Sequence, residues 1–256
     1  MKNRRREFLK KASVIPIVSI STLDLFASVN KIKNNDLYIG KNDYIHFHSI
    51  RNKLSHIQQY VGYGNFNVIS FDSMLNVAKR VPKIEAFSKD EIKFLEFIFY
   101  YNPSVHGFFG DRISNNISDE INKKLITKIP DTGHYLFKDK PEETYYEMKK
   151  DIGDSLTLTS GIRSIVKQTK LFLDKINKVD GNITVAAKSI APPGFTYHAI
   201  GDFDVGKKGF GYANFTSKFA TTHEFQEIQK LKYVDVRYTI NNKDGVRYEP
   251  WHITTI

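Results

Sequence analysis

The chain has no cysteine, a single tryptophan and no apolar run long enough to span a bilayer as a mature helix. Without cysteine it can form neither disulfides nor thiolate metal sites, so any metal ion must be held by histidine and carboxylate side chains. Internal repeats and an acidic tail are absent as well. The 256 residues are 41% hydrophobic and 26% charged, which allows one catalytic domain with a sizeable core and an N-terminal extension.

The positive charge of the chain is unevenly distributed. The net charge is +10, and the first 28 residues contribute six basic and two acidic side chains, or +4, to it. The remaining +6 is spread along the chain without a block of five or six like charges. A basic surface suits nucleic acid and equally suits an anionic cell envelope, so the N-terminal segment decides between them.

That segment, RRREFLKKASVIPIVSIS, joins a basic start to a short apolar run from Ala12 to Ser21. Within it, the stretch Arg5-Arg6-Glu7-Phe8-Leu9-Lys10 resembles the twin-arginine signal of bacterial Tat export. A basic amphipathic helix is disfavoured because such a helix would not stop at Pro16. We predict a Tat-type signal peptide over residues 1–28 and a periplasmic mature protein with no stable membrane span. Export also excludes nucleic acid as a partner.

The rest of the chain divides by composition and periodicity. Residues 29–42 are polar and rich in lysine and asparagine, which predicts a linker. Residues 43–150 are mainly helical in pattern, with a capping box from Ser88 to Glu91 and a later helix that starts near Pro141. Residues 151–256 form the predicted catalytic domain, where strand patterns mix with helical ones.

The strand patterns of this last segment predict the fold class. SLTLTSG alternates as a strand does, and YVDVRYTI alternates again before a turn at Asp244-Gly245 leads into VRYEPWHITTI. The latter pair predicts a β-hairpin. Strands and helices occur without regular βαβ alternation, which indicates an α+β fold in which helices flank an antiparallel sheet.

Three short segments carry the residues suited to chemistry. PPGFTYHAIGDFDVG supplies His198 and Asp204, and YEPWHI supplies Glu249 and His252. Two histidines and a carboxylate are a typical ligand set for catalytic zinc, which keeps one position for water. A nearby carboxylate, Glu249, can take the proton from that water. The third segment, TSGIRSIVKQ, offers Arg163 as a fork for a substrate carboxylate.

These segments resemble the VanY-type zinc D-Ala-D-Ala carboxypeptidases, which trim peptidoglycan stem peptides. The family shows Ser-Gly-Tyr-Arg-Ser followed by Gln, then Ser-x-His-x-x-Gly-x-Ala-x-Asp after Pro-Pro-Gly, and finally Glu-x-Trp-His. The matching residues here are Ser160, Gly161, Arg163, Ser164, Gln168, Pro192, Pro193, Gly194, Thr196, His198, Gly201, Glu249, Trp251 and His252. Ordered motifs in one chain are far more specific than any one alone. The resemblance covers roughly residue 151 to the C-terminus.

The resemblance implies a VanY/hedgehog-like zinc peptidase fold, an N-terminal helical extension, and an enzyme that is a zinc-dependent metallo-carboxypeptidase. It implies zinc on His198, Asp204 and His252, a general base at Glu249, and a second catalytic residue, Arg163, which faces the substrate. It also implies substrate contacts from three residues, namely Arg163, Gln168 and Thr196. The expected substrate is a peptidoglycan stem peptide ending in D-Ala. L,D-carboxypeptidase or endopeptidase activity on the same scaffold, and a peptidoglycan-binding module without turnover, remain open.

One departure from the family pattern concerns the carboxylate ligand. The family's aspartate follows the histidine by seven residues, whereas Asp204 follows His198 by six and Asp202 by four. In an unbulged strand residues 198, 200, 202 and 204 share a face, so loss of one residue could remove a bulge and keep Asp204 directed at the metal. Asp202 and Asp204 both lie an even number of residues after His198, so strand alternation does not show which of them is the ligand. Motif position favours Asp204.

Overall fold

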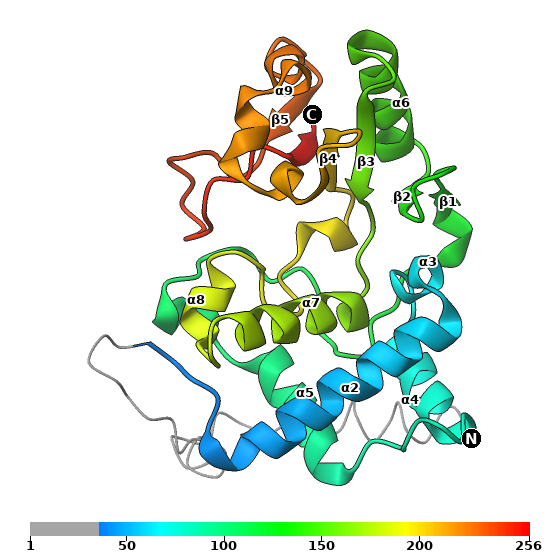
Figure 1. The fold of residues 1–256 in the computed structure, drawn as a ribbon, viewed down its shortest axis with the longest axis vertical. Helices are drawn as coiled ribbons and strands as arrows, with labels where there is room; N and C mark the ends of the chain where they lie inside the picture. Colours follow the sequence, from blue (N-terminus) through cyan, green and yellow to red (C-terminus); the bar gives the residue numbers. More distant parts are fainter. Residues whose placement is uncertain (1–35) are drawn as a thin grey trace.

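The computed structural model describes residues 36–256, which form two lobes stacked along the longest axis of the molecule (Figure 1). We call the upper one the sheet lobe and the lower one the helical lobe. The predicted signal peptide, residues 1–28, lies outside the described residues, as does the first part of the predicted linker. None of the helices within residues 36–256 combines the length and the apolar character that crossing a membrane requires.

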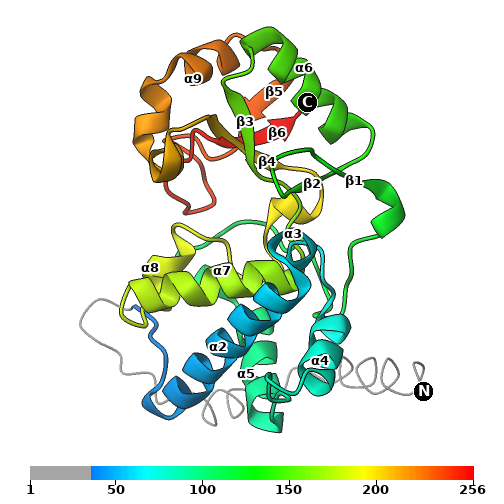
Figure 2. The same ribbon diagram turned by 45° about the vertical axis from the view of Figure 1, so that its right-hand side comes forward.

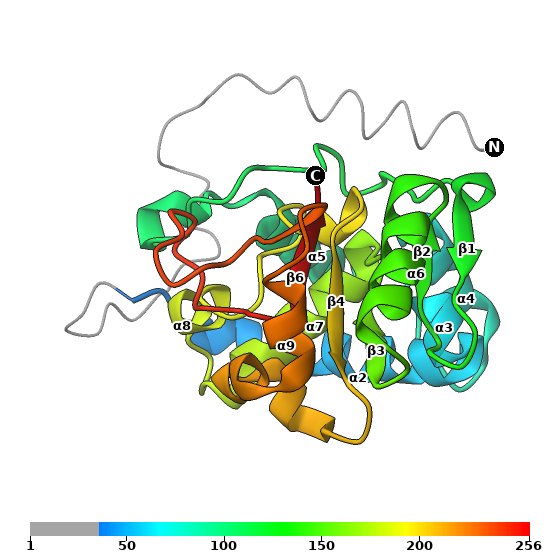
Figure 3. The same cartoon turned by 90° about the horizontal axis from the view of Figure 1, so that it is seen from above.

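The sheet lobe contains a four-stranded antiparallel sheet with helices packed against it. In spatial order its strands are β3 (Leu156–Ser160), β4 (Phe203–Lys207), β6 (His252–Thr255) and β5 (Val234–Val236). From above, β4 lies between β3 and β6 (Figure 3). Helices α6 (Lys140–Ile152) and α9 (His223–Ile228) share a hydrophobic core with this sheet. A separate two-stranded ribbon is formed by β1 (Ile126–Lys128) and β2 (Tyr135–Phe137).

The helical lobe packs five helices around a second hydrophobic core (Figure 2). Its helices are α2 (Tyr44–Val61), α4 (Phe71–Arg80), α5 (Lys89–Tyr100), α7 (Ile165–Lys178) and α8 (Ile183–Ala187), and the short α3 (Tyr63–Phe66) follows α2. The 3₁₀ helices of the described chain are η1 (Lys41–Asp43), η2 (Pro103–His106), η3 (Lys123–Leu125), η4 (Tyr197–Ala199), η5 (Gly211–Phe215) and η6 (Ser217–Thr221). Helix α7 crosses beneath the sheet and forms the boundary between the lobes (Figure 1).

Local sequence signals explain where these helices begin. Ser88 caps α5, and the reciprocal hydrogen bonds of the predicted capping box with Glu91 are present. Ser164 caps α7 by accepting a hydrogen bond from the backbone N–H of Lys167 at 3.3 Å. Pro141 occupies the first turn of α6, where its missing N–H costs nothing. Hydrophobic periodicity then buries one face of each helix.

Because successive side chains of a strand point to opposite faces, the two faces of the sheet have different surroundings. Phe203 and Ile253 are paired in β4 and β6, and both are fully buried in the core shared with α6 and α9. The next pair along the two strands, Asp204 and His252, carries side chains on the opposite face. That face looks toward α7. The α+β fold with an antiparallel sheet, helices around it and a helical N-terminal region is thus confirmed.

The two cores do not follow the predicted segment boundaries. The boundary at residues 150 and 151 falls inside α6, whose Tyr145 and Met148 pack with the sheet. Helices α7 and α8, from the predicted catalytic segment, pack instead with the N-terminal helices. The described part of the predicted linker, residues 36–42, lies along the α7–α8 turn, where Ile39 donates to the carbonyl of Gly181 at 2.9 Å. The apolar side chains within this polar segment account for its packing.

The predicted hairpin is longer and more open than expected. β5 and β6 do pair antiparallel, with Val234 opposite Thr255, but β5 ends at Val236 and residues 237–251 form the connection. The turn at Asp244-Gly245 leaves the sheet and packs on the helical lobe, where the N–H of Phe109 donates to the carbonyl of Asp244 at 2.8 Å. This inter-lobe contact replaces the strand pairing that the sequence pattern predicted.

Candidate metal centre and active site

A cavity of about 360 Å³ lies between the exposed face of the sheet and α7. All seven residues singled out in the sequence line it, namely Arg163, Gln168, Thr196, His198, Asp204, Glu249 and His252. They come from β4, β6, η4, α7 and the three segments that precede η4, α7 and β6. The fold therefore brings together, at one place, residues up to 89 positions apart in the sequence (163 and 252).

The sequence pattern predicts that His198 and Asp204 lie on one strand, but the structure places them in different elements. His198 lies in η4, and Gly201, with φ of 132°, turns the chain before β4 begins at Phe203. The alternation of side chains along one continuous strand therefore does not determine the direction of the His198 side chain. The register shift in this part of the sheet lies on β3, between Leu158 and Ser160. The shortened spacing is absorbed by the turn rather than by removal of a bulge from β4.

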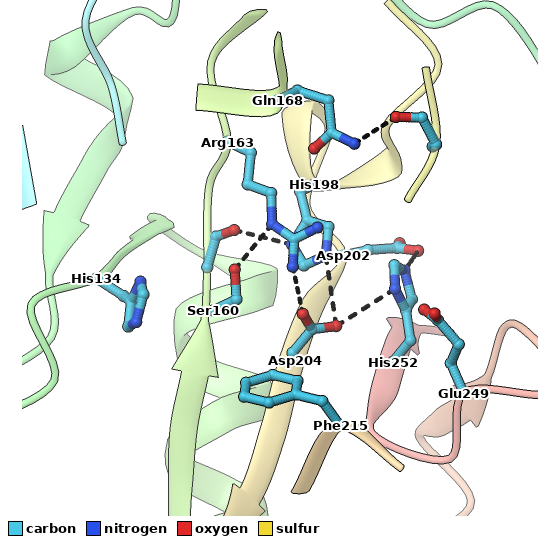
Figure 4. A network of polar contacts seen from close by, with 12 residues as sticks. His134, Ser160, Arg163, Gln168, His198, Asp202, Asp204, Phe215, Glu249 and His252 are labelled. Atoms are coloured by element: carbon cyan, nitrogen blue, oxygen red, sulfur yellow. Dashed lines mark hydrogen bonds and ion pairs between the residues drawn. The ribbon is translucent and has the colours of Figure 1, made fainter. Parts of the chain in front are cut away.

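Three side chains converge in the cavity (Figure 4). One oxygen of Asp204, Oδ1, lies 3.4 Å from Nε2 of His198 and 3.3 Å from Nδ1 of His252. Ligand atoms of the three residues all lie within 4.8 Å of one another, and the residues are 1% to 3% exposed. Ligands in a tetrahedral zinc site are separated by about 3.3 Å, given bonds of about 2.0–2.1 Å. The spacing around Asp204 matches this value.

The hydrogen bonds of the two imidazoles fix which nitrogen carries the proton. Nδ1 of His198 lies 2.8 Å from the carbonyl oxygen of Gly161. Since that oxygen can only accept, Nδ1 carries the proton and Nε2 of the neutral ring has a free lone pair. Burial, and then the charge of Arg163, lowers the pKa of His198 to about 4, which keeps the ring neutral near pH 7. His198 Nε2 and Asp204 Oδ1 are buried without a hydrogen-bond partner. Two facing acceptors of this kind fit a cation between them.

Asp202 and Asp204 contact different nitrogens of the same histidine. Asp202 Oδ2 accepts from Nε2 of His252 at 2.9 Å, which directs the Nδ1 lone pair toward Asp204. Asp202 is itself held by Arg237, which bonds both of its oxygens. A carboxylate on the remote nitrogen of a ligating histidine fixes the tautomer and orientation of the ring. The structure thus separates the two aspartates, with Asp204 in the convergent cluster and Asp202 behind it.

This outer network reaches from the sheet into the helical lobe. The guanidinium of Arg237 lies 3.8 Å from the ring centroid of Tyr197 and donates to Thr254 Oγ1 at 3.0 Å. The hydroxyl of Tyr197 donates to Asp111 Oδ2 at 3.1 Å. His252 is therefore oriented by a chain of contacts that starts in the connection between α5 and the sheet lobe.

Glu249 lies beside the cluster and is poised to exchange a proton. Its carboxyl is 7% exposed, and burial, moderated by the charge of His252, raises its pKa to about 7. Arg247 contacts it loosely, at 3.4 Å. A carboxyl that titrates near neutral pH can act both as a base and as an acid. Glu249 thus fits the proton-transfer role that the sequence indicated.

Arg163 faces the cluster rather than open space. Its Nη2 bonds Asp204 Oδ2, and its Nε donates to Ser160 Oγ at 2.9 Å (Figure 4). Burial disfavours the ionised form of Asp204, but the charges of His198 and Arg163 outweigh burial and hold its pKa well below the usual range. The carboxylate therefore stays ionised as a ligand must, and much of the charge of Arg163 is matched by it.

Gln168 and Thr196 line the cavity with unequal freedom to bind substrate. Gln168 is fully buried, donates from Nε2 to the carbonyl of Ala191 at 2.6 Å, and leaves Oε1 without a partner. Thr196 precedes η4 without capping it through its side chain. Both remain predicted substrate contacts, since a free amide oxygen and a free hydroxyl can each meet a peptide group.

The sequence reading missed three contributors to the site. Asp202 was weighed as a rival ligand and not as a partner of His252. His134, which belongs to none of the three motif segments, lines the cavity. Lys167 lines it as well, and the signal for it was its place in the first turn of α7, four residues after Arg163. Such a signal is too weak to identify a cavity residue without knowledge of the fold.

The site therefore has the donor set of a metal-dependent hydrolase. Residues 140–255 match the family model described as VanY, D-alanyl-D-alanine carboxypeptidase. The matched part of the chain includes the cluster, Glu249 and Arg163. The resemblance recognised in the motifs is confirmed, since all of the motifs lie within the matched residues, and the matching family is one of carboxypeptidases, hydrolases that act on peptide bonds.

Several solved structures are similar to this chain at low identity. A vancomycin-resistance D,D-pentapeptidase VanY from a VanB-type cassette, solved with Zn(II), is 16% identical over 51% of this chain and 77% of its own, with a TM-score of 0.36. The LD-carboxypeptidase LdcB is 23% identical over 61% and 70%, with a TM-score of 0.40. The D,D-dipeptidase VanXYg with a D-Ala-D-Ala phosphinate analogue is 20% identical over 59% and 62%, with a TM-score of 0.47. No curated protein sequence matches the chain.

Proposed function

We propose that this protein is an exported, zinc-dependent D-alanyl-D-alanine carboxypeptidase that removes the terminal D-Ala from peptidoglycan stem peptides. The observation that carries the proposal is the meeting of His198, Asp204 and His252 around one point, with Glu249 beside them in the same cavity. Neither the convergence of lone pairs nor the raised pKa of Glu249 is needed for folding, and both are needed for hydrolysis.

His198 Nε2, Asp204 Oδ1 and His252 Nδ1 would hold the zinc ion. When bound there, zinc would lower the pKa of a water molecule and polarise the scissile carbonyl. The protein contributes the orientation of its ligands. Gly161 holds His198 through its carbonyl, and Asp202 holds His252 through Nε2, so both rings keep their lone pairs directed at the same point.

Glu249 would move the protons of the reaction. Its carboxylate accepts a proton from the attacking water, and its carboxyl then donates that proton to the nitrogen of the leaving D-Ala. A pKa near 7 suits both steps, because neither form is strongly preferred at the working pH. Burial of Glu249 in the cavity wall limits competing proton exchange with bulk water.

The location proposed for this activity is the periplasm. The support is the Tat-like motif within residues 1–28 and the remaining basic character of the chain, which suits an anionic cell-wall polymer. On this proposal the partner is the stem peptide, and the mature protein contacts neither nucleic acid nor the bilayer core.

Incubation with defined muropeptides followed by mass spectrometry tests the reaction. Loss of one alanine from a pentapeptide stem, absent with the Glu249→Ala variant, is the expected result. Loss of the last residue from a tetrapeptide stem would assign L,D-carboxypeptidase activity instead, and cleavage of a cross-linked dimer would assign endopeptidase activity. An unchanged rate in the variant would remove Glu249 from its role.

Metal analysis of the purified protein tests the alternative of a binding module without turnover. The proposal predicts about one zinc per chain, whereas a binding module that has lost its metal site would carry none. The shortened motif was the reason to consider this alternative. The position of Asp204 after the turn at Gly201 supports the metal site, because its Oδ1 lies 3.4 Å from Nε2 of His198 and 3.3 Å from Nδ1 of His252.

A further inference from the structure

A carboxypeptidase differs from an endopeptidase by recognising the free carboxylate at the end of its substrate, and a cation near the metal centre would bind that group through a charge-assisted hydrogen bond. Arg163 is the obvious candidate from the sequence. In the structure its Nη2 and Nε are engaged by Asp204 and Ser160, and Asp204 is the carboxylate of the metal cluster. A substrate carboxylate at Arg163 would therefore compete with a ligand.

Lys167 offers a second cation on the same wall of the cavity. It lies one helical turn after Arg163 on α7, is half-buried, and lines the cavity together with His198 and Asp204. Its charge reaches the site, since burial first and then the charges of Lys167 and Arg163 lower the pKa of His134 to about 4. The positive charge of Lys167 therefore acts on the part of the cavity that His134 lines.

The charge of Lys167 is not compensated within the part of the chain that the structure describes. Among residues 36–256 no carboxylate forms an ion pair with it. The nearest acidic influence, Asp174, is already paired with Arg51 at 3.1 Å and with Lys170 at 2.6 Å. Burial and repulsion from Arg163 lower the pKa of Lys167 to about 8, as expected for a cation that lacks an anionic partner.

The two ends of the cavity differ in a way that orients a peptide. Beyond the cluster, on the Glu249 side, α7 continues to Lys175 and the exposed Lys178. The charges of Arg247 and Glu249 both act on the pKa of Lys175, which places it at that end. The more enclosed end with His134 and Lys167 suits the short terminal residue, and the more exposed end suits the rest of the peptide.

We infer that Lys167 is the anchor for the terminal carboxylate of the substrate and hence the residue that makes this site select free peptide ends. The inference rests on the proposed function, because it concerns the substrate of that same site. The occupant is a D-amino acid carboxylate, bound on the His134 side by one charge-assisted contact from the ammonium group.

The test compares two substrates that differ in one group. A pentapeptide stem ending in D-Ala-D-Ala is supplied with a free carboxylate or with a carboxamide, and kcat/KM is measured for the zinc-loaded full chain. We expect a preference for the free acid of roughly 10- to 100-fold. Lys167→Met should abolish most of that preference by slowing the acid alone, and Lys167→Arg should restore part of it.

Lys79→Met is the control, since this lysine lies in the last turn of α4, is exposed and does not line the cavity. It should keep the full preference for the acid. A merely structural role of Lys167 would slow both substrates equally and leave their ratio unchanged, so the ratio separates anchoring from folding. An unchanged ratio in Lys167→Met, or no preference in the parent protein, overturns the inference.

A binding measurement keeps the inference testable if neither substrate is cleaved. In that case the proposed function fails, and the affinities of acid and amide are measured in the parent protein through the fluorescence of Trp251, the single tryptophan, which lines the cavity. Tighter binding of the acid that is lost in Lys167→Met supports the anchor. Equal affinities of the two peptides refute it.

Discussion

Replacing Glu249 by glutamine should stabilise the metal-free protein above neutral pH while it removes catalysis. Burial raises the pKa of this carboxyl from 4.5 to about 7, so the folded state resists its ionisation. A raised pKa contributes stability that is complete below pH 4.5 and is lost as the pH rises through 7. Glutamine fills the same space and cannot ionise, so it escapes this loss.

The difference between the two pKa values sets the size of the effect. At about 1.4 kcal/mol per unit, the ionised carboxylate costs the folded state about 3 kcal/mol at pH 8.5. Urea unfolding in the presence of a chelator, from pH 4.5 to pH 8.5, measures the free energy of unfolding of both proteins. Glu249→Gln should equal the parent at pH 4.5 and exceed it progressively above pH 5.

Glu224 provides a control of opposite sign. It is also buried, but hydrogen bonds and the charge of Lys207 outweigh burial and lower its pKa. Glu224→Gln should therefore lose stability at pH 8.5, because the native carboxylate is favoured there. If Glu249→Gln shows no gain, or a gain independent of pH, the carboxyl is not held in a raised-pKa state and the proton-transfer argument fails.

Three further predictions concern the support of the metal site. Asp202→Ala should weaken zinc binding about 10- to 100-fold in a competition with a chelating dye, with partial recovery in Asp202→Asn; unchanged affinity would exclude it as the partner that orients His252. His198→Ala should leave the protein folded by circular dichroism but free of zinc by elemental analysis, and a full complement of zinc would exclude His198 as a ligand. Gly161→Ala would bring a Cβ to 2.0 Å from the carbonyl oxygen of Tyr135, so it should lower the free energy of unfolding by about 1–3 kcal/mol; an unchanged urea midpoint would contradict this packing.

The features that the sequence predicted well depend on local signals. The capping box at Ser88, the start of α6 at Pro141 and the alternating pattern of β3 each arise from residues close together in the chain. The cavity residues were found because ordered motifs carry information that single residues do not. These signals can be interpreted without knowledge of the tertiary fold.

The features that the sequence did not predict depend on contacts between distant segments. His198 lies in η4 because Gly201 turns the chain, and alternation in the sequence gave no sign of it. The loop with Asp244 leaves the sheet because the helical lobe binds it. The different contacts of Asp202 and Asp204 could not be predicted without the position of His252. This histidine lies in β6, the last strand of the chain, which pairs with β4.

The central claim is that one zinc ion is held by His198, Asp204 and His252. An anomalous-difference map from a crystal of the zinc-loaded protein, collected at the zinc absorption edge, tests it most directly. The account predicts one strong peak about 2.0–2.2 Å from His198 Nε2, Asp204 and His252 Nδ1. A map with no peak among these three side chains, or with the ion bound to Asp202 in place of Asp204, would contradict it.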